Sequence, residues 1–164
     1  MSKVLSVSRE EIGELAELAN EVWHEFFPCI LTLEQIDYMV EKFQSRAAMT
    51  KQVDEGYEYY FITLENGERA GYIGIHDEGS KLFLSKLYLK KDHRGKGLAS
   101  VAFDFLDGLC AERGIKELYL TVNRRNHGAI AVYKAKGMEI VREQVCDIGN
   151  GFVMDDYVFS KEYD

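Results

Sequence analysis

The spacing of apolar residues changes partway along the chain, from the period of helices to that of strands. Before residue 57, apolar residues recur every three or four positions, as at Ile12, Leu15 and Leu18. From Tyr57 onward, most apolar residues alternate with polar ones, which is typical of strands buried on one face. The pattern predicts a helical N-terminal part followed by a sheet into which two further helices are inserted.

The helical part begins and is interrupted at recognisable local signals. Ser8-Arg9-Glu10-Glu11 has the sequence of a capping box, which starts a helix. Phe27-Pro28-Cys29 should end that helix, because proline disfavours helical backbone in the residue before it. The predicted elements of this part are a strand at 3–7, a helix reaching Phe26, a second helix opened by Thr32 with Gln35, and a helical turn or two within 45–56.

The rest of the chain reads as short strands with two helices between them. Glu65-Asn66-Gly67-Glu68 separates two alternating runs and predicts a hairpin. Ala99, Ala102, Phe105, Leu106 and Leu109 are predicted to form the buried face of a long helix that ends at Gly114. The predicted elements are strands at 59–64, 70–76, 82–89, 115–122, 138–145 and 153–159, and helices before Gly114 and at 126–136. This order predicts a mixed α/β architecture and not a doubly wound parallel sheet.

A basic, glycine-rich loop follows the strand predicted at 82–89. It reads Arg94-Gly95-Lys96-Gly97-Leu98-Ala99 and leads directly into the long helix. Glycine lets the backbone approach an anion closely, and the first N–H groups of a helix lack intrahelical acceptors. With the charges of Arg94 and Lys96 nearby, the loop is predicted to bind phosphate. Its spacing matches neither a P-loop nor the GxGxxG fingerprint.

Two motifs together resemble the GNAT superfamily of acetyl-CoA-dependent N-acetyltransferases. Arg94 to Ala99 fits the family pattern Gln/Arg-x-x-Gly-x-Gly/Ala, and Leu87-Tyr88-Leu89 resembles the strand before it. Farther on, Asn126-x-x-Ala129-x-x-x-Tyr133-x-x-x-Gly137 is similar to the family's second motif. The resemblance covers roughly Tyr57 to Phe159. It implies the GNAT fold, a mostly antiparallel sheet of about seven strands with a splayed parallel pair, flanked by helices.

The resemblance also implies roles for particular residues. The backbone N–H groups of Arg94, Gly95, Lys96, Gly97, Leu98 and Ala99 would bind the pyrophosphate of coenzyme A. Backbone groups near Leu87, Tyr88 and Leu89 would bind the pantetheine and polarise the thioester carbonyl. Asn126 would contact the pantetheine arm, and Tyr133 would be the general acid.

The spacing of Asn126 and Tyr133 is compatible with these roles. Seven residues are two helical turns, so the two side chains share one face about 10 Å apart. A phenol stays protonated to about pH 10 and can protonate a thiolate whose conjugate acid has a pKa of about 8.5. A packed aromatic residue for Tyr133 and a helix N-cap for Asn126 are the alternative interpretations.

The general base is less apparent. Some relatives carry a glutamate on the fourth strand, and Phe83 occupies the aligned position here. Glu25, Asp155 and Asp156 are candidates for binding the amine or taking its proton. The alternative is removal of the proton through water, with these three as solvated surface carboxylates. If acidic side chains collect the amine, cationic or polyamine-like acceptors should be favoured. Trp23, Phe26 and Phe27, with Tyr57 and Tyr59, could roof an acceptor pocket or belong to the core.

Length, charge and composition limit the number of domains, the partners and the location that can be expected. The 164 residues predict one domain, and the net charge of −8 argues against nucleic acid as a partner. No N-terminal apolar region or long apolar run indicates secretion or a membrane, so a cytoplasmic protein is expected. Three cysteines without CxxC spacing, and histidines without metal spacing, predict neither a disulfide framework, nor a metal site, nor an acetyl-cysteine intermediate.

The sequence therefore predicts an enzyme that moves an acetyl group from acetyl-CoA to a primary amine in a ternary complex. The acceptor, a small molecule or a peptide, is not readable, and a homodimer is left open. A catalytically silent acyl-CoA-binding or sensing module is the alternative, although it would not need Tyr133. A nucleotide-binding regulatory domain would not explain the spacing of Asn126 and Tyr133.

Overall fold

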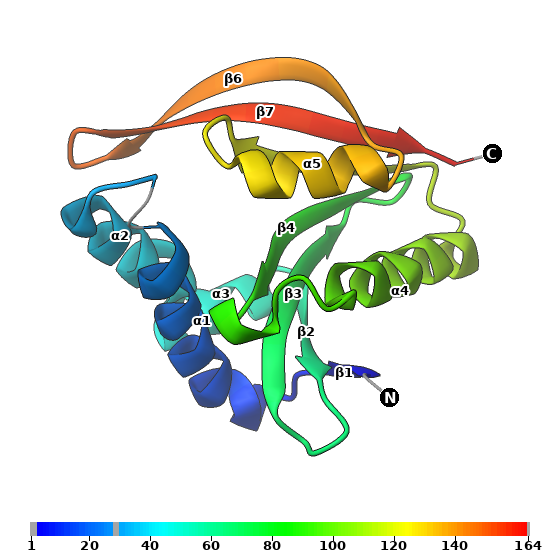
Figure 1. Ribbon diagram of the computed structural model, residues 1–164, viewed down its shortest axis with the longest axis horizontal. Coiled ribbons are helices and arrows are strands. Elements are labelled where there is room, and N and C mark those ends of the chain that lie inside the picture. The colour runs from blue at the N-terminus through cyan, green and yellow to red at the C-terminus, as the bar shows by residue number, and fades with distance from the viewer. Residues whose placement is uncertain (1–2, 28–29, 164) are drawn as a thin grey trace.

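A seven-stranded sheet with helices on both faces organises the chain (Figure 1). The computed structural model describes residues 3–27 and 30–163. The strands are β1 (Lys3–Ser6), β2 (Tyr57–Thr63), β3 (Arg69–Asp77), β4 (Lys81–Leu89), β5 (Glu117–Asn123), β6 (Glu139–Gly149) and β7 (Phe152–Glu162). They lie in the order β1-β2-β3-β4-β5-β7-β6, and within the described residues only β4 and β5 run parallel. The predicted fold class, mostly antiparallel with one parallel pair, is confirmed.

The parallel strands β4 and β5 separate after a short stretch of pairing. Their register runs from Lys81 opposite Glu117 to Phe83 opposite Tyr119. Both strands continue, to Leu89 and Asn123, with no ladder between them in the described part of the chain. The facing strand edges there have backbone N–H and C=O groups that no neighbouring strand uses. This opening positions the candidate site.

The helices begin and end close to the predicted boundaries. They are α1 (Ile12–Phe26), α2 (Leu33–Met39), α3 (Arg46–Asp54), α4 (Leu98–Arg113) and α5 (His127–Ala135), with a π-helical turn over Val40–Gln44. The hydroxyl of Thr32 accepts the Gln35 N–H, and Gly114, at φ 68°, ends α4. Pro28 and Cys29, the predicted break, lie outside the described residues. Within those residues, none of the helices has the length and apolar character that crossing a bilayer requires.

The helices divide the core into layers. Helices α1 and α3 cover one face of the sheet, where Leu15 and Met49 pack with Phe61 and Tyr72. Helix α4 covers the opposite face together with residues of α5. A third cluster, around Trp23 and Ile36, joins α1 and α2 to the tip of the β6–β7 hairpin.

The predicted buried face of α4 was partly wrong. Phe103 and Cys110 are buried, whereas Phe105 and Leu109 are only partly buried. Phe103 turns toward the ring of Tyr133 in α5, 5.9 Å away, while Phe105 contacts Tyr60 at 4.8 Å. Apolar residues flank both sides of this helix, so the local pattern could not indicate which side α5 would cover.

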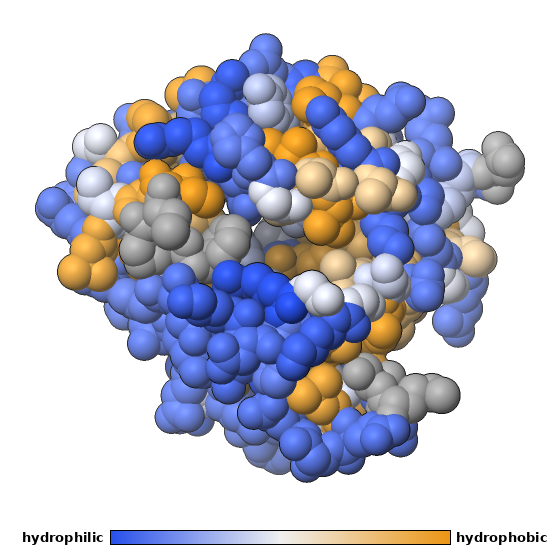
Figure 2. Space-filling view, viewed as in Figure 1, coloured by the Kyte–Doolittle hydropathy of each residue, from blue (hydrophilic) through white to orange (hydrophobic). Residues whose placement is uncertain are grey.

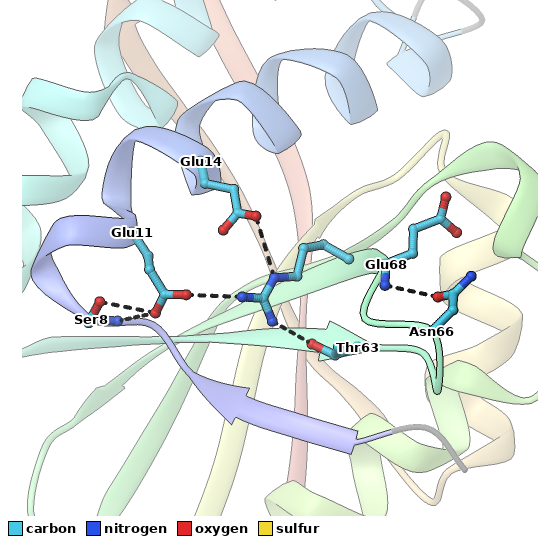
Figure 3. A network of polar contacts seen from close by, with 7 residues as sticks. Ser8, Glu11, Glu14, Thr63, Asn66 and Glu68 are labelled. Atoms are coloured by element: carbon cyan, nitrogen blue, oxygen red, sulfur yellow. Dashed lines mark hydrogen bonds and ion pairs between the residues drawn. The ribbon is translucent and has the colours of Figure 1, made fainter.

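A polar network fixes the start of α1 to the β2–β3 hairpin (Figure 3). The Glu11 carboxylate accepts hydrogen bonds from the Ser8 N–H and hydroxyl, both at 3.0 Å. Its other oxygen accepts from Arg69 at 2.9 Å, and Arg69 also donates to the Thr63 hydroxyl. Glu14 lies 3.6 Å from the same guanidinium. The predicted capping box therefore also anchors α1 on the sheet.

Candidate active site

A cavity of about 730 Å³ occupies the opening between β4 and β5. Figure 2 shows a hollow near the centre of this face, with apolar residues inside it. Its walls come from α1, α2, β4, β5, α4, α5 and β7 together with the loop before α4. One continuous space thus connects the predicted phosphate loop to Asn126, Tyr133 and Asp156.

The loop before α4 has a backbone suited to an anion. Gly95 and Gly97 have φ values of 74° and 79°, in the region that favours glycine. Where a Cβ would stand on either residue, no atom of another segment lies within 4 Å. Gly97 is the N-cap of α4, whose first N–H groups lack intrahelical acceptors. Arg94, Gly95, Gly97, Leu98 and Ala99 line the cavity, while the exposed Lys96 is not among its lining residues.

The side chain of Arg94 forms hydrogen bonds to the protein backbone. Its Nε and Nη2 donate to the carbonyl of Leu89 at 3.1 and 3.0 Å, which fixes the loop to the end of β4. Partial burial lowers the pKa of the guanidinium. Lys136 is a second cation in the wall, and its Nζ donates to the Ser100 hydroxyl at 2.5 Å. Lys136 was not predicted as a site residue, because a lysine near a helix C-terminus is common on protein surfaces.

A β-bulge interrupts β4 where it leaves β5. Leu84 pairs with Ile75 and Lys86 with Gly74, so Ser85 is an extra residue. Bulges re-aim side chains and leave backbone groups outside the ladder. Ser85 lines the cavity beside Leu87, Tyr88 and Leu89. The bulge was not predicted, because the run from Leu82 to Leu89 reads as one strand.

Asn126 and Tyr133 lie on the wall that α5 contributes. Asn126 caps α5, its Oδ1 accepting the Ala129 N–H at 3.3 Å, so the N-cap interpretation is correct. Tyr133 is 8% exposed, and its ring lies between those of Phe103 and Phe159. Burial raises the pKa of its phenol to about 12, so the hydroxyl keeps its proton at neutral pH.

Of the three candidate carboxylates, the structure brings Asp156 alone to the cavity wall that it describes. Asp156 is 2% exposed, and burial, with the nearby charge of Asp155, raises its pKa to about 6. Asp155 instead accepts a hydrogen bond from Arg124 at 2.8 Å. Glu25 is exposed and accepts the backbone N–H of Lys91 at 3.2 Å. Alternation along β7 explains why the two neighbouring aspartates face opposite sides.

Aromatic residues form the end of the cavity nearest α1. Trp23 stacks on Phe27 with ring centroids 4.2 Å apart, and Tyr88 lies edge-on to both. Tyr59 is not among the lining residues, because its hydroxyl bonds to Gln52 and Lys86 beneath α3. The ring of Tyr57 instead lies tilted against that of His76, with centroids 4.6 Å apart. The side chain of Phe26 lies outside the described residues.

Other residues expected near the chemistry have structural partners. Phe83, aligned with the missing glutamate, stacks on Tyr119 at 5.0 Å and does not line the cavity. The part of the chain that the structure describes contains no group of three His, Cys, Asp or Glu residues arranged to hold a metal. Asp156 apart, the residues that α2 and β7 contribute to the wall were not predicted from the sequence; they include Gln35, Met39, Val153 and Met154.

Comparison with known proteins identifies the family. Residues 15–138 match the model of the acetyltransferase (GNAT) family. The chain belongs to this family. It is therefore an acetyltransferase, and the family resemblance inferred from the two motifs is confirmed.

Relatives of this GNAT chain differ in their named acceptors. A Bacillus subtilis protein provisionally named as a ribosomal protein bS18-alanine N-acetyltransferase is 29% identical over 66% of this chain and 78% of its own length. A spermidine N(1)-acetyltransferase of Thermoplasma acidophilum is 21% identical, over 93% of this chain and 95% of its own. The crystal structure of the PaiA N-acetyltransferase of Thermoplasma acidophilum with coenzyme A superposes with a TM-score of 0.82 at 20% identity, covering 99% of each chain.

Proposed function

We propose that this chain transfers the acetyl group of acetyl-CoA directly to a primary amine bound in the same cavity. The observation that carries the proposal is the continuity of that cavity. It joins the loop at the N-terminus of α4, the hydroxyl-bearing Tyr133 and the buried carboxylate of Asp156. A phosphate site, a proton donor and an amine site are what this transfer needs.

The residues present fit coenzyme A. The positive φ values of Gly95 and Gly97 and the free space over them suit a pyrophosphate at the start of α4. The separated edge of β4, with its bulge at Ser85, suits the pantetheine, which carries amide groups that pair with backbone. The same edge would polarise the thioester carbonyl through N–H groups. The complex of PaiA with coenzyme A, which shares the fold, supports this assignment.

Asp156 and Tyr133 have complementary protonation states. With a pKa near 6, Asp156 is a carboxylate at neutral pH and can hold an ammonium, while Tyr133 is a neutral phenol. Apolar surroundings lower the pKa of a bound amine and raise that of Asp156. The difference between the two pKa values becomes smaller, which makes proton transfer from the ammonium to Asp156 easier. Asp156 accepts one proton from the ammonium, the neutral amine nitrogen then bonds to the carbonyl carbon, and the carbon–sulfur bond breaks. The departing thiolate takes the proton of Tyr133, and the second proton that leaves the amide nitrogen restores the phenol.

Direct transfer is favoured over an acetyl-enzyme. Cys110 is buried in the core under α4, and Cys146 is exposed on β6. Neither cysteine lines the cavity. Among the described residues no thiol lies beside the proposed thioester site, which supports direct attack by the amine.

The test is release of free thiol from acetyl-CoA by the purified protein with a panel of primary amines. We expect amine-dependent thiol release, with mass spectrometry showing acetylated amine. Calorimetry with acetyl-CoA serves as the control for binding. Tight binding of acetyl-CoA without acetylation of any amine would support the silent acyl-CoA-binding module instead. Absence of both would contradict the cofactor assignment as well.

A further inference from the structure

We propose that the acceptor is a small primary amine with a single charged group on an apolar skeleton, and not a polyamine or a peptide segment. The inference rests on the proposed function and concerns the part of the cavity between α1, α2 and the β6–β7 hairpin. Three observations carry it: the apolar walls there, the single carboxylate, and the closure between α2 and the hairpin.

The walls at this end are apolar. Apart from Gln35 and Asp156, the lining side chains from α1, α2 and β7, with the segment that leads into α2, are apolar: Val22, Trp23, Phe27, Leu31, Met39, Val153 and Met154. Trp23 is 4% exposed and Phe27 is 5% exposed, so packing against neighbouring side chains holds both rings in place. Surfaces of this kind gain from burying hydrocarbon and provide no hydrogen bonds to a charged group.

One carboxylate serves the whole cavity. Among the described lining residues, Asp156 is the only acidic side chain, and the cations, Arg94 and Lys136, belong to the wall made by the loop and α5. A monoamine can place its ammonium on Asp156 and its carbon chain against the apolar walls. A diamine or polyamine would leave a second ammonium against those walls without a carboxylate partner, which is unfavourable.

Helix α2 reaches the β6–β7 hairpin and continues the wall. The Gln35 side-chain N–H donates to the Val153 carbonyl at 3.3 Å, and both residues line the cavity. The Tyr38 hydroxyl donates to the Ile148 carbonyl at 2.7 Å, and its ring lies 5.4 Å from that of Phe152. Figure 1 shows α2 beside the turn of this hairpin. These contacts hold α2 against the hairpin and restrict the room for an extended peptide, whereas a small amine leaves them in place.

The deciding experiment compares hexylamine with 1,6-diaminohexane, which has the same carbon chain and one more charge. The rate of thiol release gives kcat/KM for each, together with spermidine and a peptide with a free N-terminus. We expect kcat/KM for hexylamine to exceed that for the diamine by at least about tenfold, since the second ammonium must be desolvated without a partner. 2-Phenylethylamine should also be a good acceptor, because aromatic rings line the pocket.

Two variants at one position test the charge argument. Val153 is 53% exposed and lines the cavity, so a longer polar side chain can be accommodated there. Val153→Glu should raise the preference for the diamine over hexylamine at least about tenfold, by supplying the missing partner. Val153→Gln, of equal size and neutral, should leave the preference unchanged. If either variant fails to fold, the wild-type comparison still decides.

Each outcome separates this inference from the proposed function. A preference for 1,6-diaminohexane or spermidine would overturn the single-charge inference while leaving acetyl transfer standing. A peptide turned over faster than hexylamine would overturn the closed-pocket argument. If no amine is acetylated although acetyl-CoA binds, the proposed function fails and this inference fails with it.

Discussion

Leu84 and Lys86 flank a single residue of β4, yet their side chains lie on opposite faces of the sheet. Leu84 packs in the cluster beneath α4. The Nζ of Lys86 donates to the Gln52 side chain at 2.7 Å and to the Tyr59 hydroxyl, beneath α3. Residues two apart on a regular strand share a face, and the bulge at Ser85 reverses this. The bulge that opens the site therefore also buries a lysine.

The first prediction concerns the stability cost of that lysine. Burial lowers the pKa of Lys86 to about 7, and the unfolded value is about 10.4. Between these values the unfolded chain binds more protons, so stability should rise with pH from about 7 to 10. Lys86→Met should therefore raise the free energy of unfolding at pH 7 by about 2–4 kcal/mol, and less at pH 10. Urea unfolding at the two pH values measures this.

Lys81, an exposed lysine on the same strand, provides the matched control. Lys81→Met should change the free energy of unfolding by no more than about 0.5 kcal/mol at either pH. A destabilised Lys86→Met variant at pH 7 would mean that the hydrogen bonds to Gln52 and Tyr59 outweigh the desolvation of the ammonium.

The strand that contains Leu84 and Lys86 could be predicted from the sequence, but its bulge could not. The strand from Leu82 to Leu89 was predicted, because apolar alternation is a local property. The bulge depends on the partner strand β3, which skips Ser85 in its register. This one-residue shift in the pairing register places Lys86 and Tyr88 on the opposite face of the sheet from the one a regular strand would give. No local sequence signal indicates the shift. The burial of Lys86 could thus not be predicted from its position in the sequence.

Some residues of the candidate site could likewise be predicted from the sequence, and others could be found only in the structure. The loop from Arg94 to Ala99 and the pair Asn126 and Tyr133 were predicted from motifs, and they line one cavity, Lys96 excepted. The distinction between Asp155 and Asp156 came only from the structure, because Arg124 engages the first and the sheet buries the second. The α2 wall likewise depends on packing against a hairpin more than 100 residues away in the chain.

The second prediction tests the phosphate loop. Gly97→Val would force a β-branched residue into a φ of 79° and place its side chain over the start of α4. Affinity for acetyl-CoA, measured by calorimetry, should fall at least about tenfold, or about 1.4 kcal/mol. Gly79→Val imposes a similar strain at φ 89° in the β3–β4 turn and should leave affinity unchanged. Equal affinities for both folded variants would remove the loop from the site.

The third prediction follows from the burial of Asp156. Its pKa near 6 lies above the unfolded value of about 3.9, so the native state binds more protons between them. Stability should therefore fall as pH rises from about 4 to 6 and then remain lower. Asp156→Asn should raise the free energy of unfolding by about 2–3 kcal/mol at pH 7 and hardly at pH 4, while reducing kcat/KM. Asp155 and Arg124 also act on this carboxyl.

Asp155→Asn is the matched control for that measurement. It removes a partly exposed ion pair with Arg124 and does not touch the cavity, so stability should change by no more than about 1 kcal/mol. In the wild type, kcat/KM should also decline as pH falls below about 6, where Asp156 takes up its proton. A flat profile down to pH 5 would argue against an ionised Asp156 in the reaction.

The last prediction is that Tyr133 protonates the departing thiolate. Tyr133→Phe keeps the ring between Phe103 and Phe159, so it tests the hydroxyl alone. Removal of a positioned general acid should lower kcat by about 10²-fold or more. Affinity for acetyl-CoA should hardly change, because the loop before α4 is untouched. Single-turnover kinetics would ensure that the chemical step is measured.

The hydroxyl of Tyr60 gives the control, because it bonds to Glu58 and does not line the cavity. Tyr60→Phe should leave kcat unchanged. With a pKa near 12, the phenol of Tyr133 stays protonated throughout the working range, so its loss should lower the rate equally from pH 7 to 9. A Phe variant that turns over at the wild-type rate, with chemistry limiting, would assign the proton to water. Tyr133 would then serve only to pack α5 against α4.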